Sequence, residues 1–129
     1  MPQSIHPEKT ISFGNLNLSC ETASFYKENE EKLKLTPQQY ALMEMFFLSP
    51  THILNRSDIC ESLWPGKINA DETLNTLIRR LRPLVEENSN LKITTDRGRA
   101  YVLEIKKSDH LWSLFHFYLD RINIFHRPG

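Results

Sequence analysis

The side chains with the clearest chemistry in this sequence are arginines in two short segments. Five of them stand out: Arg79, Arg80, Arg82, Arg97 and Arg99. The first three lie within residues 73–83, which contain no acidic residue, and the last two flank Gly98. A guanidinium group can donate two hydrogen bonds to guanine or pair with a phosphate, and threonine can contact a thymine methyl group or a phosphate. These residue types therefore fit the recognition of a nucleic acid.

The other reactive residues lack the spacing that catalysis or metal binding needs. The five histidines show no ligand spacing with cysteines or carboxylates, and no glycine-rich phosphate loop is present. Cys20 and Cys60 are lone cysteines without a CxxC spacing. We expect both to be free, buried thiols in a reducing compartment. The sequence therefore predicts no enzyme activity, no metal and no cofactor.

Length and composition indicate one folded domain. The chain has 129 residues, of which 40% are hydrophobic and 25% charged, enough for a packed core. Sixteen basic residues balance sixteen acidic ones, which excludes a protein coated in positive charge but not one that segregates its charges. No stretch is apolar and uncharged for ~18 residues, and the first ten residues lack a secretion signal. We therefore expect a cytoplasmic protein without a complete membrane span.

The segment that holds three of the arginines has the periodicity of an amphipathic helix of about 17 residues. Its apolar stripe, predicted to face the core, contains Leu74, Ile78, Leu81 and Val85, with Leu77 at its edge. The opposite face contains Glu72, Thr73, Thr76, Arg79, Arg80, Pro83 and Glu87. Such a helix fits the major groove of B-DNA, which is ~12 Å wide. The alternative is a solvated helix with ordinary surface arginines.

Short elements precede this helix. Turn residues separate four strand-like segments, which predicts an antiparallel meander over TISF, LNLSC, ASFYK and KLK, between Thr10 and Lys34. A capping box of Thr36 and Gln39, with Pro37 at the first helical position, predicts a helix that ends near Ser49. Residues 52–54 are predicted to form an extended link.

A second helix and a hairpin complete the pattern. Asn55 is expected to cap a helix from Arg56 to Trp64. Two strands, 91–95 and 100–105, flank a turn in which Gly98 supplies the positive φ of a tight hairpin. Three helices followed by a hairpin are the order of a winged helix-turn-helix. Arginines at the hairpin tip could enter a minor groove beside the third helix.

Three stretches carry a family resemblance: LTPQQYALMEMFFLSPTHILNRSDICESLWP, DETLNTLIRRLRPLV and ITTDRGRAYVL. They resemble the OmpR/PhoB-type winged-helix DNA-binding domain of bacterial response regulators, which ToxR-like one-component regulators share. The resemblance covers residues 10–105. It implies an α+β winged helix-turn-helix with an N-terminal four-stranded antiparallel sheet, three helices and a C-terminal β-hairpin wing.

The resemblance also implies a function and its residues. It implies a sequence-specific transcriptional regulator of double-stranded DNA, with the third helix in the major groove and the wing at the minor groove. The DNA-binding residues that it implies are Asn55, Arg56, Thr73, Thr76, Arg79, Arg80, Arg82, Thr95, Arg97 and Arg99, with Arg82 on the flank of the helix. The loop Lys67–Ala70 matches the loop that can face RNA polymerase in this family.

Among the positions that depart from the family pattern, two support an alternative. Glu72 stands where the family often has arginine, although it could also be a capping partner for Asn69. Leu77 replaces a polar residue that can face DNA. With the zero net charge, these departures favour a protein-interaction module or anti-regulator with weak or no DNA binding.

The two ends of the chain are predicted to lie outside this domain. Residues 1–9 are expected to form a flexible leader. We expect no receiver domain before the winged helix, so the pattern predicts a stand-alone effector, or one controlled by its tail or by a partner. Residues 106–129 are predicted to form an amphipathic, aromatic-rich helix with a stripe of Leu111, Phe115, Tyr118 and Ile122. This helix could pack on its own domain, form a homodimer or bind a partner, or lie on a membrane surface.

Overall fold

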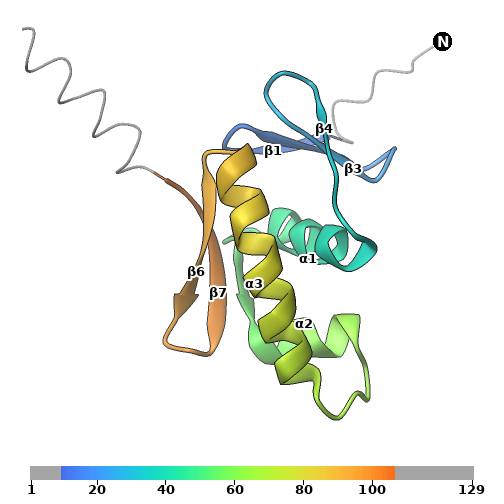
Figure 1. Cartoon of the computed structure of the whole chain (residues 1–129), viewed down its shortest axis with the longest axis vertical. Coiled ribbons are helices and arrows are strands. Elements are labelled where there is room, and N and C mark those ends of the chain that lie inside the picture. Colours follow the sequence, from blue (N-terminus) through green and yellow to red (C-terminus); the bar gives the residue numbers. More distant parts are fainter. Residues whose placement is uncertain (1–9, 107–129) are drawn as a thin grey trace, which may run out of the picture.

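The computed structural model describes residues 10–106, so the predicted leader and all but the first residue of the predicted C-terminal helix lie outside the described residues. Figure 1 shows an N-terminal sheet, three helices and a C-terminal hairpin. The elements are β1 (Thr10–Phe13), β2 (Leu16–Ser19), β3 (Ser24–Tyr26), β4 (Lys32–Leu33), α1 (Pro37–Leu48), β5 (Ile53–Asn55), α2 (Arg56–Leu63), α3 (Ala70–Asn88), β6 (Leu91–Asp96) and β7 (Ala100–Ile105).

The N-terminal strands form the predicted antiparallel meander in the order β1-β2-β3-β4. Leu16, Leu18, Phe25 and Leu33 are buried on one face of this sheet and join a single core to which all three helices and the second sheet contribute. The sheet therefore belongs to the same folded unit as the helices.

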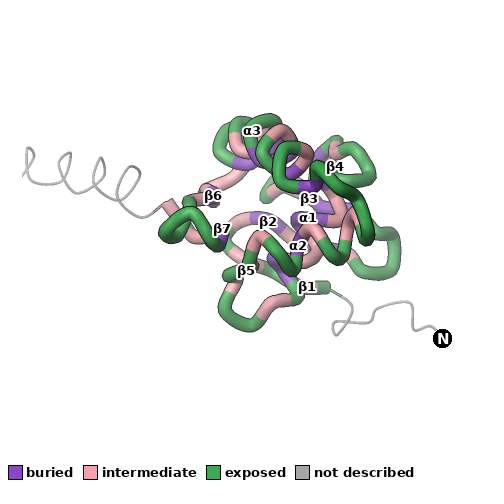
Figure 2. Tube along the Cα trace, turned by 90° about the horizontal axis from the view of Figure 1, so that it is seen from below, coloured by how far each residue is buried: buried purple, intermediate pink, exposed green. Residues whose placement is uncertain are grey.

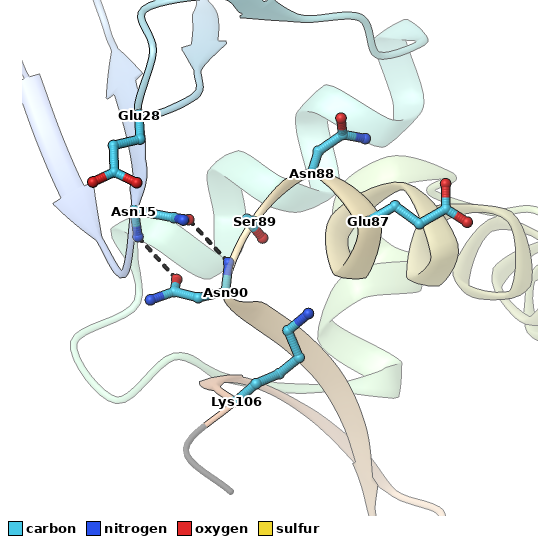
Figure 3. A pocket seen from close by; sticks show the side chains of 7 residues that line it. All are labelled: Asn15, Glu28, Glu87, Asn88, Ser89, Asn90 and Lys106. Carbon is cyan, nitrogen blue, oxygen red and sulfur yellow. Dashed lines mark hydrogen bonds between the residues drawn. The ribbon is translucent and has the colours of Figure 1, made fainter. Parts of the chain in front are cut away.

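The turn between β1 and β2 connects this sheet to the end of α3. Gly14 there has a φ of 59°, and a Cβ on it would lie 2.4 Å from Oδ1 of Asn90. The backbone N–H of Asn15 donates to Oδ1 of Asn90 and the backbone N–H of Asn90 donates to Oδ1 of Asn15, both at 2.9 Å (Figure 3). This close packing requires glycine at position 14.

The start of α1 confirms the predicted capping box. The backbone N–H of Gln39 donates to Oγ1 of Thr36 at 3.2 Å, and the backbone N–H of Thr36 donates to Oε1 of Gln39 at 2.9 Å. Because both bonds form between residues three apart, the local sequence was sufficient to locate this helix start.

The extended conformation predicted for residues 52–54 is confirmed from residue 53, but the segment is more than a link, because Ile53–Asn55 is strand β5. It pairs antiparallel with β7, with Ile53 opposite Val102, so the wing sheet has three strands in the order β5-β7-β6. Asn55 is the N-cap residue of α2, as predicted, but its side chain makes no cap hydrogen bond. The helix ends at Leu63, one residue before the predicted Trp64.

Helix α3 has 19 residues and buries its predicted stripe of Leu74, Ile78, Leu81 and Val85. Leu77 is only 7% exposed, so it belongs to the core and its departure from the family pattern does not concern a DNA-facing position. The predicted pairing of Asn69 with Glu72 is wrong, because the Asn69 side chain makes no cap bond. Its carbonyl instead accepts hydrogen bonds from the backbone N–H and Oγ1 of Thr73.

The two cysteines are free, as predicted, but the prediction that they are buried is wrong. Cys20 is exposed because β2 ends at Ser19, before the inward alternation of Leu16 and Leu18 reaches position 20. Cys60 is partly exposed. Burial and the nearby Asp71 carboxylate raise the pKa of the Cys60 thiol, and this disfavours the reactive thiolate.

Candidate nucleic-acid interface

The outward face of α3 presents the predicted polar residues. Arg79 and Arg80 are exposed, and Thr73 and Thr76 are half-buried. Figure 2 shows green, exposed positions along α3 alternating with purple ones turned to the core. Asn75 is also exposed, one helical turn before Arg79, although the sequence analysis did not select it.

The hairpin tip presents the second pair of arginines. The backbone N–H of Arg99 donates to the carbonyl of Asp96 at 3.1 Å. Gly98 has the predicted positive φ, 71°, and Arg97 also has a positive φ, 55°. Positive φ at both central residues is characteristic of a type I′ hairpin turn, whose twist matches that of the strands. Arg97 and Arg99 are exposed, and Figure 1 shows the tip at the same end of the molecule as the start of α3.

These four arginines have no acidic partner in the described structure. The ion pairs found within residues 10–106 are Lys27–Glu31 and Arg56–Asp71. Exposed carboxylates do lie on the same two elements, at Asp71 and Glu72 in the first turn of α3 and at Asp96 beside the wing tip. The surface is therefore mixed in sign but keeps its arginine side chains free of ion pairs.

Arg82 and Thr95, both predicted to contact DNA, contact each other in the structure. Nη2 of Arg82 donates to Oγ1 of Thr95 at 2.8 Å, and Nε donates to the carbonyl of Ile93 at 3.1 Å. The Arg82 side chain thus joins α3 to β6.

Arg56 is also held within the protein. Its Nη1 donates to the hydroxyl of Tyr101, and its Nη2 donates to the carbonyl and Oδ1 of Asp71 at 3.2 and 3.3 Å. Only 19% of the Arg56 side chain is exposed. The neighbouring Asn55 is exposed, and its amide lies 3.5 Å from the carboxylate of Asp58. The contacts of Asp71 and Tyr101 with Arg56 could not be predicted from the sequence, because nothing in the local pattern shows that these residues meet.

A hollow of about 770 Å³ lies elsewhere, between the β1–β2 turn and the end of α3 (Figure 3). Three of its polar side chains are engaged with the protein: Asn15 and Asn90 bond each other, and the Lys106 ammonium donates to the carbonyl of Glu86 at 2.7 Å. Within residues 10–106, no three histidine, cysteine or carboxylate side chains come together as a metal site. No helix in this part of the chain has both the length and the apolar character of a membrane span.

A match to a family model shows which protein family the chain belongs to. The model described as "Transcriptional regulatory protein, C terminal" matches residues 29–103, more than half of the chain. The chain belongs to this family. The OmpR/PhoB resemblance is therefore confirmed, and the family is not an enzyme class.

Two curated relatives of this family member are transcriptional regulators. The phosphate regulon regulatory protein PhoB of Rhizobium meliloti is 31% identical over 93 residues, which cover 70% of this chain and 40% of PhoB. The regulatory protein PcoR of Escherichia coli is 33% identical over 79 residues, which cover 60% of this chain and 35% of PcoR. The chain thus spans about two fifths of the length of these relatives.

Solved structures confirm the winged-helix fold. The DNA-binding domain of Bacillus subtilis CssR superposes with a TM-score of 0.58 at 27% identity, covering 68% of this chain and 98% of that domain. The DNA-binding domain of Klebsiella pneumoniae RstA, solved in complex with the RstA box, has a TM-score of 0.62 at 21% identity, covering 74% of this chain and 97% of that domain.

Proposed function

We propose that this protein is a transcriptional regulator that binds double-stranded DNA, with α3 in the major groove and the wing at the minor groove. One observation carries the proposal: two neighbouring elements each present a pair of exposed arginines that have no ionic partner among residues 10–106. These are Arg79 and Arg80 on α3, and Arg97 and Arg99 on the wing. CssR supports it, since the 27% identical part of that protein is a DNA-binding domain.

Each element suits one groove. A helix fits the major groove, where arginine can read guanine and Thr73 or Thr76 can contact a methyl group or a phosphate. The minor groove carries a strongly negative potential where it is narrow, which attracts arginine side chains such as those at the wing tip. We therefore propose Thr73, Thr76, Arg79 and Arg80 as major-groove residues and Arg97 and Arg99 as minor-groove residues.

Further partners remain proposals. The loop Lys67–Ala70 is a candidate contact for RNA polymerase, and its Ile68 side chain is 94% exposed, which is unusual for isoleucine. A homodimer through the C-terminal segment and a cytoplasmic location also remain proposals. The rival interaction-module hypothesis loses the support of Leu77, which is buried, but keeps that of Glu72, which is exposed.

A salt titration tests the proposal. The full chain is bound to a duplex that it has selected from a random pool, and the dissociation constant is measured between about 50 and 200 mM salt. We expect a linear loss of log affinity with log salt. Because each phosphate contact contributes about 0.9 to the slope, Arg99→Gln should lower it by about one, and Arg97→Gln likewise.

The control is Lys32→Gln, which removes an exposed cation from the N-terminal sheet and should leave the slope unchanged. Failure to enrich any duplex, or a slope that neither wing variant alters, would contradict the proposed interface and favour the interaction module.

A further inference from the structure

The two internally bonded arginines meet the same pair of residues in the wing. Thr95 of β6 and Tyr101 of β7 are directly opposite each other in the antiparallel register, one pair before Asp96 and Ala100, where the hairpin turn begins. Arg82 donates to the hydroxyl of Thr95, and Arg56 donates to the hydroxyl of Tyr101. We name these four residues the wing anchor.

The Arg82 half of the wing anchor ties the wing to the middle of α3. Arg82 stands two residues after Arg80, so the two side chains leave the helix on widely separated sides. Arg80 is exposed, whereas Arg82 is half-buried and directs two donors at β6. The planar guanidinium can bond the Ile93 carbonyl and the Thr95 hydroxyl at once, which a lysine ammonium on a flexible stem would not do in a fixed geometry.

The Arg56 half ties the wing to the start of α3. The guanidinium bonds Tyr101 on one side and the carbonyl and carboxylate of Asp71 on the other, and its Cζ lies 5.6 Å from the Tyr101 ring centroid. The backbone N–H of Arg56 also donates to the carbonyl of Arg99, at the tip itself, at 2.8 Å. Tyr101 is only 5% exposed, so its hydroxyl depends on this protein partner.

We propose that Arg56 and Arg82 are positioning residues that hold the wing tip at a fixed place relative to α3, rather than residues that contact phosphate. This inference rests on the proposed function. If α3 and the wing occupy adjacent grooves together, a wing tip that is already fixed in the free protein loses less conformational entropy when it binds DNA. Loss of the wing anchor therefore weakens binding where both elements fit, at the selected site, more than binding to unrelated DNA.

Substitutions in the Arg82 half of the wing anchor distinguish positioning of the wing tip from direct contact with phosphate. The full-length variants Arg82→Gln, Arg82→Lys, Thr95→Val and the double variant Arg82→Gln/Thr95→Val are titrated with the selected duplex and with an unrelated one. We expect each single variant to lose roughly tenfold in affinity for the selected duplex. The double variant should lose no more, because the effects of substituting two residues that bond each other do not add. The salt slope should stay at the wild-type value, and Arg82→Lys should behave like Arg82→Gln.

A direct phosphate contact gives the opposite pattern and would overturn the proposal. Arg82→Gln would then lower the slope by about one and weaken both duplexes alike, Arg82→Lys would retain affinity, and Thr95→Val would add its effect independently. Tyr101→Phe tests the Arg56 half while keeping the buried ring, and it should reproduce the selective loss.

Amide exchange in the absence of DNA tests the wing anchor independently of function. The amides of residues 94–101 should exchange faster in Arg82→Gln and Thr95→Val than in wild type, while those of α1 keep their rates. Unchanged exchange in both variants would overturn the proposal. Failure of the wild-type chain to bind any duplex would instead refute the proposed function and leave the exchange result to decide whether the wing anchor exists.

Discussion

Arg80 and Arg82 carry the same charge on the same helix, but their surroundings give them different chemistry. Arg80 is exposed and has no ionic partner in the part of the chain that the structure describes. Two N–H donors of Arg82 are hydrogen-bonded to β6. A guanidinium already bonded to protein would have to give up those bonds to reach a phosphate, whereas a hydrated one exchanges only water and counterions.

The Tyr40 side chain predicts how the stability of the folded protein changes at high pH. Burial, reinforced by a hydrogen bond of 3.1 Å from its hydroxyl to the Glu44 carboxylate, raises the pKa of Tyr40 to about 12. A tyrosine in an unfolded chain has a pKa of about 10. The protonated phenol is thus favoured in the folded state, so its contribution to stability is complete below pH ~10 and is lost as the pH rises towards about 12.

Urea unfolding at a series of pH values measures this effect. The free energy of unfolding should fall more steeply between pH ~10 and ~12 in the wild type than in Tyr40→Phe, because the variant lacks the titrating group. Tyr26→Phe, in β3, is the matched control for the loss of a tyrosine hydroxyl. Parallel curves for Tyr40→Phe and wild type would show that Tyr40 does not couple to folding.

At the scale of elements, the capping box of α1 gives a stability prediction. Thr36→Ala removes the acceptor for the backbone N–H of Gln39 and should cost about 1 kcal/mol of the free energy of unfolding. Gln38→Ala is the control, because Gln38 lies in the same exposed turn and its side chain is not the capping partner. Chemical denaturation of the two variants checks this, and equal stabilities would show that the capping box contributes nothing measurable.

The sequence could predict the elements whose formation depends on residues that are close together in the chain. Thr36 and Gln39 are three residues apart, the apolar stripe of α3 repeats along one helix, and Gly98 marks its own turn. Strand β5 is different: three residues become a strand only because β7, far along the chain, pairs with them. Asn55 and Asn69 are the N-cap residues of α2 and α3, but neither side chain makes a cap bond, because a favoured residue type at a helix start does not fix where its side chain points.

The same distinction applies to the candidate site. A helical wheel predicted which side of α3 carries Arg79 and Arg80, because that side follows from the buried stripe. It could not predict the wing anchor, since Thr95 lies 13 residues after Arg82 and Tyr101 lies 45 residues after Arg56. Only the packing of the wing against α2 and α3 brings these side chains together.

For the whole molecule, zero net charge coexists with segregated charge. The exposed acids Glu28, Glu30 and Glu31 lie in the β3–β4 turn of the N-terminal sheet, while the wing tip carries Arg97 and Arg99. Figure 1 shows these two regions at opposite ends of the molecule. The separation is incomplete, because Lys27 pairs with Glu31 and Lys32 is exposed beside the acids, while Asp96 is exposed beside the wing tip. If the wing tip meets DNA, the acids of the β3–β4 turn lie far from its phosphates, which favours an approach with the wing first.

Removal of the C-terminal segment is the prediction that concerns the whole chain. Within residues 10–106, the buried core residues run from Leu16 to Leu103, so a chain that ends at Lys106 retains every one of these and we expect it to fold. Residues 107–129 carry Leu111, Phe115, Tyr118 and Ile122 at the spacing of a helix–helix seam. If this segment joins two copies, it raises the local concentration of the second copy at a neighbouring site.

Deletion of residues 107–129 should therefore lower the oligomeric state and weaken binding to a duplex with two tandem copies of the selected site more than to a duplex with one. Light scattering and titrations with both duplexes measure the two effects. Deletion of residues 1–9, which removes the other terminal segment, is the control and should leave both unchanged. A full-length chain that is already monomeric, and whose truncation aggregates, would show instead that the C-terminal segment covers its own domain, because the apolar surface it left behind would then be exposed.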